Sequence, residues 1–134
     1  HFQSLFPGFI FAHRVNADMV WGSIPFYESL TLGGASTVRG LSATRVHGEQ
    51  RILLNTELRW RGILLSRNQH LYSGILIFAD FGQIVEQMQG LSIENWRRGL
   101  GIGARMLWQS TVFRADLARS DKRTGLYITF DQVF

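Results

Sequence analysis

The segment 32–41 contains the residue pattern of this chain that points most clearly to a chemical role. It reads Leu-Gly-Gly-Ala-Ser-Thr-Val-Arg-Gly-Leu, so paired glycines precede a single cation, Arg39. Glycine lets a backbone bend tightly, and a planar guanidinium can grip a carboxylate with two hydrogen bonds. The pattern therefore predicts a tight tip that offers one guanidinium for ion pairing. The residues of this tip motif are Gly33, Gly34, Val38, Arg39 and Gly40.

Other kinds of site are not predicted. The segment lacks the Gly-Lys-Ser/Thr ending of a phosphate-binding loop. The four histidines are scattered without ligand spacing and the chain has no cysteine, so we expect no metal site. No nucleophile-elbow pattern accompanies the serines, histidines and aspartates, so we expect no catalytic residue, no cofactor and no enzymatic activity.

A tip of this kind must be held by other elements, and much of the chain alternates apolar and polar residues with period two. Leu100 and Ile102, for example, share a face opposite Arg105, and Arg97 falls on the same face as Arg105. Such alternation is typical of β-strands. Arginines and glycines crowd the polar faces, which favours barrel strands with lipid outside and water inside. The predicted strands are 9–21, 50–61, 71–82, 96–108, 112–119 and 125–134.

Two acidic residues fall on the polar faces of neighbouring predicted strands, Glu57 on the second and Asp80 on the third. The connections alternate between short turns and longer loops, which is the rhythm of an up-and-down antiparallel meander. The longest connection, 22–49, contains the tip motif and shows no strand pattern, and loops of this length are usually functional or disordered. A charge enclosed in a barrel interior needs a counter-charge, so Asp80 and Glu57 are candidate partners of Arg39.

Composition narrows the class of protein. The chain has 134 residues, 46% of them hydrophobic, with 14 glycines and a net charge of +4. Its basic residues are spread over the strands rather than clustered, so a nucleic-acid module is the less favoured interpretation. No stretch approaches the about 20 apolar residues of a membrane helix, but barrel strands need only about 9–11. The first residues do not resemble a signal peptide, so an export signal is expected in a longer precursor.

The order of the motifs is more specific than any one of them. After the tip motif come Asn-Thr-Glu-Leu-Arg at 55–59, Phe-Ala-Asp-Phe-Gly at 78–82, Gly-Leu-Gly-Ile-Gly-Ala-Arg at 99–105, Arg-Ala-Asp at 114–116 and a final Phe134. From about residue 9 to the end, this order resembles the carboxy-terminal part of the barrel in the BamA/TamA-type outer-membrane assembly and secretion proteins, also called bacterial surface antigens. The resemblance implies an all-β fold in which the chain 1–134 supplies the last six strands of a sixteen-stranded transmembrane β-barrel.

The resemblance also implies roles for particular residues. The connection 22–49 is expected to fold back into the barrel lumen, where Arg39 pairs first with Asp80 and second with Glu57 on the inner wall. This sequence departs from the family at Leu41, where Phe or Tyr is usual, so the packing of the tip stays open. The aromatic residues Phe130 and Phe134 resemble the terminal signal that the barrel-assembly machinery reads.

The implied function is that of a bacterial outer-membrane protein that inserts other proteins into the outer membrane or translocates them across it. One alternative is an exporter of, or an anchor for, a single secreted or fused partner. An alternative from another class is a soluble β-barrel that binds a small apolar ligand. The expected partners are outer-membrane lipid, client or secreted proteins, and the missing amino-terminal barrel strands and periplasmic domains, but not nucleic acid. The chain alone is expected to self-associate through unpaired strand edges.

Overall fold

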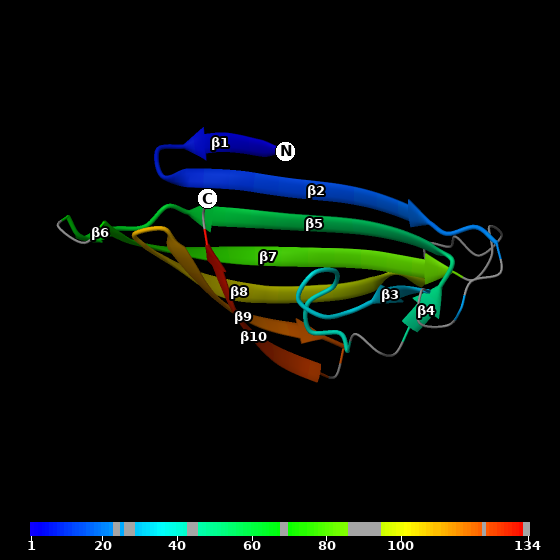
Figure 1. The fold of residues 1–134 in the computed structure, drawn as a ribbon. Helices are drawn as coiled ribbons and strands as arrows, with labels where there is room; N and C mark the ends of the chain where they lie inside the picture. Colours follow the sequence, from blue (N-terminus) through cyan, green and yellow to red (C-terminus); the bar gives the residue numbers. More distant parts are fainter. Residues whose placement is uncertain are drawn as a thin grey trace.

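The computed structural model describes residues 1–22, 25, 29–42, 46–67, 70–85, 95–121 and 123–132. These residues form one large antiparallel sheet and a separate two-stranded ribbon (Figure 1). The long strands lie side by side in chain order, which confirms the predicted all-β antiparallel meander. They are β2 (Phe9–Met19), β5 (Gln50–Trp60), β7 (Leu71–Val85), β8 (Arg97–Trp108), β9 (Thr111–Ser120) and β10 (Arg123–Gln132). The sheet is open, and its edges are β1 (Phe2–Phe6) and β10.

Four short strands lie outside the predicted set. β1 pairs with β2, and β6 (Leu64–Ser66) pairs with β7. Inside the long connection, β3 (Leu30–Leu32) pairs with β4 (Val46–Gly48). The prediction that 22–49 carries no strand is therefore wrong at these two places. Strands of three residues are too short to show the alternation on which the prediction depends.

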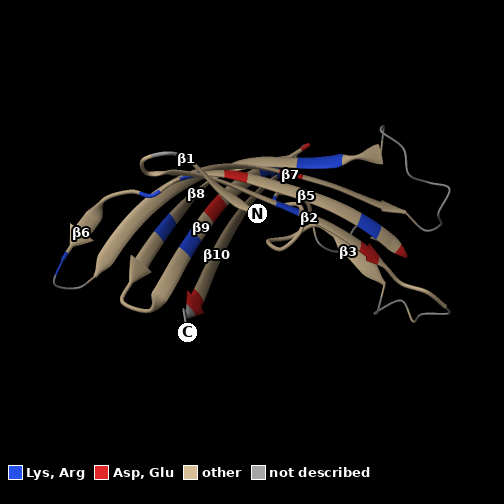
Figure 2. Ribbon diagram, turned by 90° about the horizontal axis from the view of Figure 1, so that it is seen from above, with Lys and Arg blue, Asp and Glu red and all other residues tan. Residues whose placement is uncertain are grey.

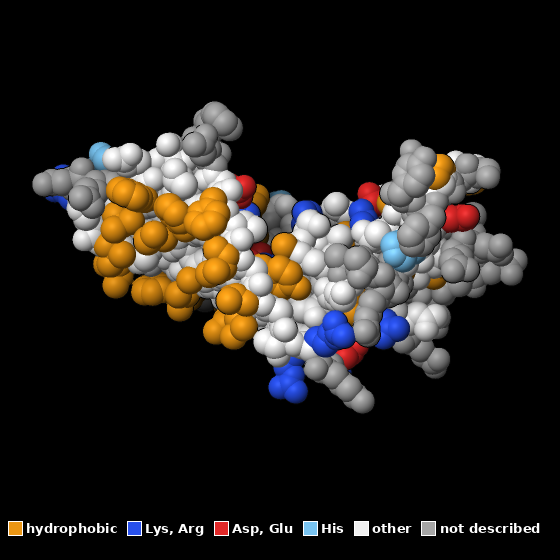
Figure 3. Space-filling model, turned by 60° about the horizontal axis from the view of Figure 1, so that its bottom comes forward, with side chains coloured by type: hydrophobic (Ala, Val, Ile, Leu, Met, Phe, Trp, Pro, Cys, Tyr) orange, Lys and Arg blue, Asp and Glu red, His pale blue; other side chains and the backbone are white. Residues whose placement is uncertain are grey.

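Alternation along the long strands sorts their side chains onto two faces. On β8, Leu100 and Ile102 are 52% and 59% exposed on the outer face, whereas Gly99 is buried on the face that meets the long connection. Apolar side chains form a broad area on the outer surface (Figure 3). Arg105 lies on the inner face as expected, whereas Arg97 is exposed at the end of the sheet and lies 3.7 Å from Asp121.

Aromatic residues flank the apolar stretch of several strands. Trp96 and Trp108 bracket β8, and Phe9 and Trp21 bracket the apolar face of β2. At about 3.3 Å per residue, the interval from Trp96 to Trp108 measures roughly 40 Å along the strand. A tilt of about 40° reduces this to roughly 30 Å, which matches the hydrocarbon core of a bilayer and the aromatic girdles of membrane barrels.

The two ends of the sheet carry different connections. Tight turns at Pro7–Gly8 and Gln109–Ser110 close one end, whereas the long connections 20–49 and 86–96 leave the other. In outer-membrane barrels the long loops are extracellular, which orients the sheet. The part of the long connection around 29–42 turns back across one face of the sheet (Figure 1), and the view from above places it on the concave side of the curved sheet (Figure 2). The described residues include no helix with the length and hydropathy needed to cross a bilayer.

Candidate functional site

The tip motif forms a compact turn within the long connection. The Gly33 amide donates to the Thr37 hydroxyl, and that hydroxyl donates to the Gly33 carbonyl, each at 2.7 Å. The Gly34 amide donates to the Leu41 carbonyl at 2.9 Å and closes the base of the turn. Because these bonds satisfy backbone groups inside the turn, the tip holds its own shape and presents Arg39 to the sheet.

Arg39 grips a carboxylate of the sheet wall, Asp80 on β7. Its Nε lies 2.7 Å from Oδ2 and its Nη2 lies 3.0 Å from Oδ1, so the guanidinium fork engages both carboxylate oxygens. The Arg39 backbone amide also donates to Oδ2, at 3.2 Å. The side chain of Asp80 is 0% exposed and that of Arg39 is 7% exposed. A bidentate pair shielded from water in this way is strong and fixes the orientation of the tip.

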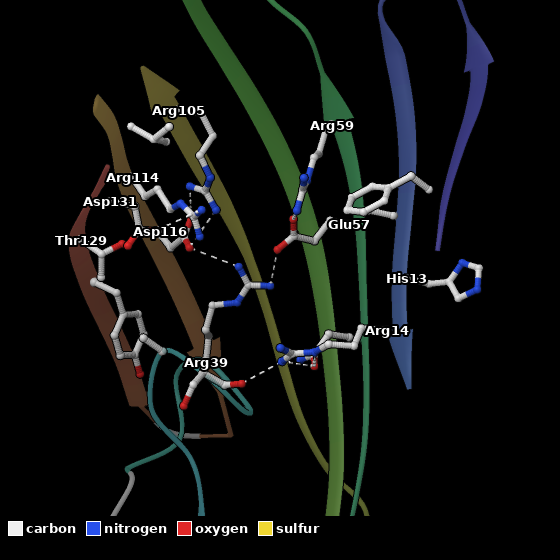
Figure 4. Close-up of a pocket in the computed structure, with 17 residues that line it drawn as sticks. His13, Arg14, Arg39, Glu57, Arg59, Arg105, Arg114, Asp116, Thr129 and Asp131 are labelled. Atoms are coloured by element: carbon white, nitrogen blue, oxygen red, sulfur yellow. Dashed lines mark hydrogen bonds and ion pairs between the residues drawn. The ribbon is translucent and has the colours of Figure 1, made fainter. Parts of the chain in front are cut away.

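Two further carboxylates reach the same guanidinium. Glu57 on β5 places Oε1 2.9 Å from Nη2, and Asp116 on β9 places Oδ2 3.1 Å from Nη1. The structure thus brings Arg39 together with both residues that the sequence nominated, Asp80 and Glu57. It adds Asp116, which the sequence did not nominate. Strands β5, β7 and β9 therefore converge on one cation (Figure 4 labels Arg39, Glu57 and Asp116).

The charge of Arg39 is secure although the residue is buried. Arg39 lies between β3 and β4, outside the long strands. Burial by itself lowers the pKa of a guanidinium, but hydrogen bonding to Asp80 and the negative charges of Asp80, Glu57 and Asp116 more than offset burial. The net effect raises the pKa of Arg39 above its usual range. The ring of Phe78 adds a cation–π contact, with its centroid 3.4 Å from the guanidinium carbon.

Two of the three carboxylates have an arginine of their own. Arg59 places Nη2 2.7 Å from Oε2 of Glu57. Arg105 donates to both oxygens of Asp116, at 2.5 and 3.0 Å. These arginines belong to the wall strands β5 and β8, and they remain there whatever the loop does (Figure 4). Glu57 and Asp116 are therefore neutralised twice, once by the wall and once by the tip.

Asp80 is supported differently. The Asn55 amide donates to Asp80 Oδ1 at 2.8 Å and to the Thr37 carbonyl at 2.7 Å. Arg14 donates to Asn55 Oδ1 and to the Ser36 carbonyl, both at 2.8 Å. Within the described part of the chain, no arginine other than Arg39 pairs with Asp80. The most buried carboxylate of the site thus depends on the tip for its counter-charge.

Glycines give the tip a close seat on the wall. A Cβ atom at Gly99 on β8 would lie 2.0 Å from the Arg39 carbonyl oxygen, so only glycine fits beneath the tip. Gly40 has φ +89° and a Cβ there would lie 2.8 Å from the Ser120 backbone nitrogen. The left-handed backbone and the close contact both require glycine at position 40. The tip backbone at Arg39 and Gly40 therefore lies directly against the backbone of β8 at Gly99 and of β9 at Ser120.

An apolar cluster anchors the base of the tip. Val38 is fully buried against Leu32 and Leu53, and Leu41 packs at the edge of this cluster. A Cβ at Gly82 would lie 2.6 Å from the Leu32 side chain, so that wall position is also closely covered. The departure at Leu41 from the aromatic residue of the resembling family thus leaves an apolar contact in place.

A tyrosine of the edge strand holds the tip from the other side. The Gly40 amide donates to the Tyr127 hydroxyl on β10 at 2.9 Å. The Tyr127 ring packs against the buried cluster of Leu76, Phe78 and Ala118. This hydroxyl is the polar contact that joins the tip to β10.

Replacing Tyr127 with phenylalanine is expected to loosen the tip without removing a charge. The buried Gly40 amide loses its acceptor, which costs about 1–3 kcal/mol. We expect trypsin to cleave the purified full-length protein after Arg39 about tenfold faster or more. Tyr72→Phe is the matched control, because Tyr72 is 43% exposed at the opposite end of the sheet. Equal cleavage rates for Tyr127→Phe and the unchanged protein would show that the contact contributes nothing.

A cavity of about 730 Å³ lies between the tip and the inner faces of the strands. Charged side chains line it, including Arg39, Glu57, Arg59, Arg105 and Asp116. Among the residues with described positions, no group of acidic or histidine side chains is arranged to hold a metal ion. The arrangement can bind charged groups and can hold a movable loop by ion pairs.

The proposed barrel-assembly signal is only partly visible. Phe130 lies on the outer face of β10, is 65% exposed, and stacks edge to face on Phe113 with centroids 5.3 Å apart. Phe134 lies outside the described residues. The role of these two residues stays a prediction.

Sequence reasoning missed two residues that contact the tip, Asp116 on β9 and Tyr127 on β10. Alternation places Asp116 and Tyr127 on inner faces, and the structure shows that they are directly opposite each other. Sequence alone does not give the level of each strand relative to the next. The glycines of β8 were the available signal, because they mark where another backbone approaches the sheet.

One family model matches the chain. It is the model of the haemolysin secretion/activation proteins ShlB/FhaC/HecB, and it matches residues 1–106. No curated protein and no solved structure matches the chain. The matched residues include the tip motif, Glu57 and Asp80.

The match corrects the resemblance drawn from the motifs, because it points to the secretion proteins and not specifically to BamA/TamA-type assembly factors. Its members are outer-membrane transporters, which confirms the expected localisation and the expectation that the chain is not an enzyme. With a match over most of its length, the chain belongs to the haemolysin secretion/activation protein family ShlB/FhaC/HecB.

Proposed function

We propose that this chain is part of an outer-membrane transporter that exports one partner protein of the haemolysin type. Family membership supports this function over general insertion of membrane proteins, which the motifs alone favoured. The match to the secretion family carries the proposal, and the burial of Arg39 among Asp80, Glu57 and Asp116 beside a charged cavity supports a loop placed inside a transport path. A loop held by ion pairs inside a transport path can both close the path and leave it.

The tip acts as a retractable support. In the resting state it fills the space beneath β7 and β8 and holds the inner wall together. During export the partner passes through the interior as an unfolded chain and displaces the tip. No covalent chemistry takes place, because the work consists of exchanging ion pairs and hydrogen bonds.

The open sheet is the carboxy-terminal part of a larger, sixteen-stranded barrel in this proposal. The outer face of the sheet is apolar and bracketed by aromatic residues, whereas its edges at β1 and β10 have free hydrogen-bonding groups. Lipid does not tolerate such edges. Further strands of the same protein therefore pair with both edges, and Phe130 and Phe134 help the assembly machinery to close the barrel.

Deletion of the gene in its native bacterium tests the proposed function. We expect a single large exoprotein to vanish from the culture medium, while the set of outer-membrane barrel proteins keeps its normal abundance. Quantitative proteomics of the medium and of the outer membrane measures both. Re-expression of the gene restores the exoprotein. A general loss of barrel proteins would instead identify an assembly factor, and an unchanged medium would rule out an exporter.

A further inference from the structure

Charged residues are almost absent from the outer faces of the long strands. The outward positions of the described strands β2, β5, β7, β8, β9 and β10 carry apolar or uncharged polar side chains with two exceptions, Arg98 on β8 and Arg119 on β9. Both arginines are exposed. An arginine on the lipid face costs about 2–4 kcal/mol at the bilayer midplane but only about 0–1 kcal/mol near the interface. Their position along the strands therefore matters.

Both arginines lie at the end of the sheet that carries the long connections. Arg98 is two residues inside Trp96, and Arg119 lies directly opposite Leu100. They are consequently diagonal neighbours, about 7–8 Å apart across the two strands. Long side chains can extend from such positions to the headgroup region. Two guanidinium groups can then reach one phosphate from two sides.

The neighbouring charges reinforce a basic surface. Arg97 and Arg123 are exposed at the same end, and Arg97 pairs loosely with Asp121. Among the described residues, no carboxylate lies within ion-pair distance of Arg98, Arg119 or Arg123. Figure 3 shows basic side chains gathered next to the apolar area, toward the end with the long connections. We name Arg98 and Arg119 the basic rim.

We propose that the basic rim binds the phosphate groups of anionic lipids in the outer leaflet of the membrane, with Arg98 and Arg119 as the principal contacts. The apolar outer face below the rim receives the acyl chains of the same lipid, and the bracketing Trp96 sits at the boundary between the two. An extracellular position follows from the long connections at this end. Charge complementarity and continuity with the apolar surface favour a lipid over an acidic protein.

The test uses the full-length protein purified in detergent, with purified lipid A as the probe. Arg98→Gln/Arg119→Gln is compared with Arg61→Gln/Arg67→Gln, which removes two exposed arginines at the tight-turn end. Each arginine near an anionic lipid surface contributes about fivefold to binding, so we expect the first variant to bind lipid A roughly thirtyfold more weakly. The control variant should bind lipid A as tightly as the unchanged protein. Arg98→Lys/Arg119→Lys is expected to keep most of the binding, because the charge remains.

Three results would overturn the proposal. The first is unchanged lipid A binding by Arg98→Gln/Arg119→Gln that migrates as a folded barrel in semi-native electrophoresis. The second is equal binding of lipid A from which the phosphates have been removed, because the apolar surface would then act alone. The third is full competition by inorganic phosphate at the same concentration, which would identify a soluble anion as the ligand in place of a lipid.

Discussion

Replacing Arg39 with alanine is expected to abolish export while the protein remains in the outer membrane. The change leaves Asp80, which is 0% exposed, without its counter-charge, and it removes one partner each from Glu57 and Asp116. Breaking a buried ion pair from one side costs about 3–5 kcal/mol. The tip then leaves its seat for most of the time, and the inner wall loses the support that the resting tip gives to the transport path. The measurement is the amount of exoprotein in the medium relative to the amount of folded barrel in isolated outer membranes.

Arg114→Ala is the matched control for Arg39→Ala. Arg114 also faces the interior, but it is half-exposed and pairs only with the half-exposed Asp131 at 3.1 Å. Exposed pairs of this kind contribute about 0–1 kcal/mol, so export should stay near normal. Export by Arg39→Lys should lie between that of Arg39→Ala and that of Arg114→Ala, because lysine keeps the charge but cannot make the bidentate pair with Asp80. Normal export by Arg39→Ala would remove the role assigned to the tip.

Replacing Gly99 with alanine is expected to block export almost as strongly, although no charge changes. The new methyl group would lie 2.0 Å from the Arg39 carbonyl oxygen and 3.2 Å from the Val38 side chain. The backbone of the tip cannot retreat without stretching the ion pairs of Arg39, so the tip is displaced as a unit. Faster trypsin cleavage after Arg39, measured alongside the exoprotein in the medium, reports this displacement.

Ala104→Val controls for the addition of bulk to the same strand. Ala104 is exposed on the outer face of β8, where extra methyl groups meet lipid and not protein. Export should be unaffected. If Gly99→Ala exports as well as Ala104→Val and shows the same cleavage rate, the tip does not rest on β8 during function.

The long strands were predictable because each has one face toward lipid and one toward a charged interior. That contrast imposes strict alternation over ten or so residues, as on β8. The hairpin of β3 and β4 was not predicted, because a strand of three residues is too short to show an alternation of apolar and polar residues. β1 escaped because Phe2 and Phe6 are separated by a mixed run without clear alternation.

The central residues of the site were also predictable, but Asp116 and Tyr127 were not. A glycine-flanked arginine and two inward carboxylates pointed to Arg39, Asp80 and Glu57. Asp116 and Tyr127 required the stagger between β7, β8, β9 and β10, which depends on pairing across the whole sheet. The family branch was wrong for a related reason. The shared motifs describe how the loop meets the wall, and that contact says nothing about which protein is transported.

The double neutralisation of Glu57 and Asp116 has a consequence for how the path opens. When the tip withdraws, Arg59 and Arg105 still balance these two carboxylates, so the vacated wall carries little stray charge. Asp80 alone is left with only the amide of Asn55. The resistance to opening is therefore concentrated at one carboxylate, and a passing chain that offers a basic side chain there would ease its own entry.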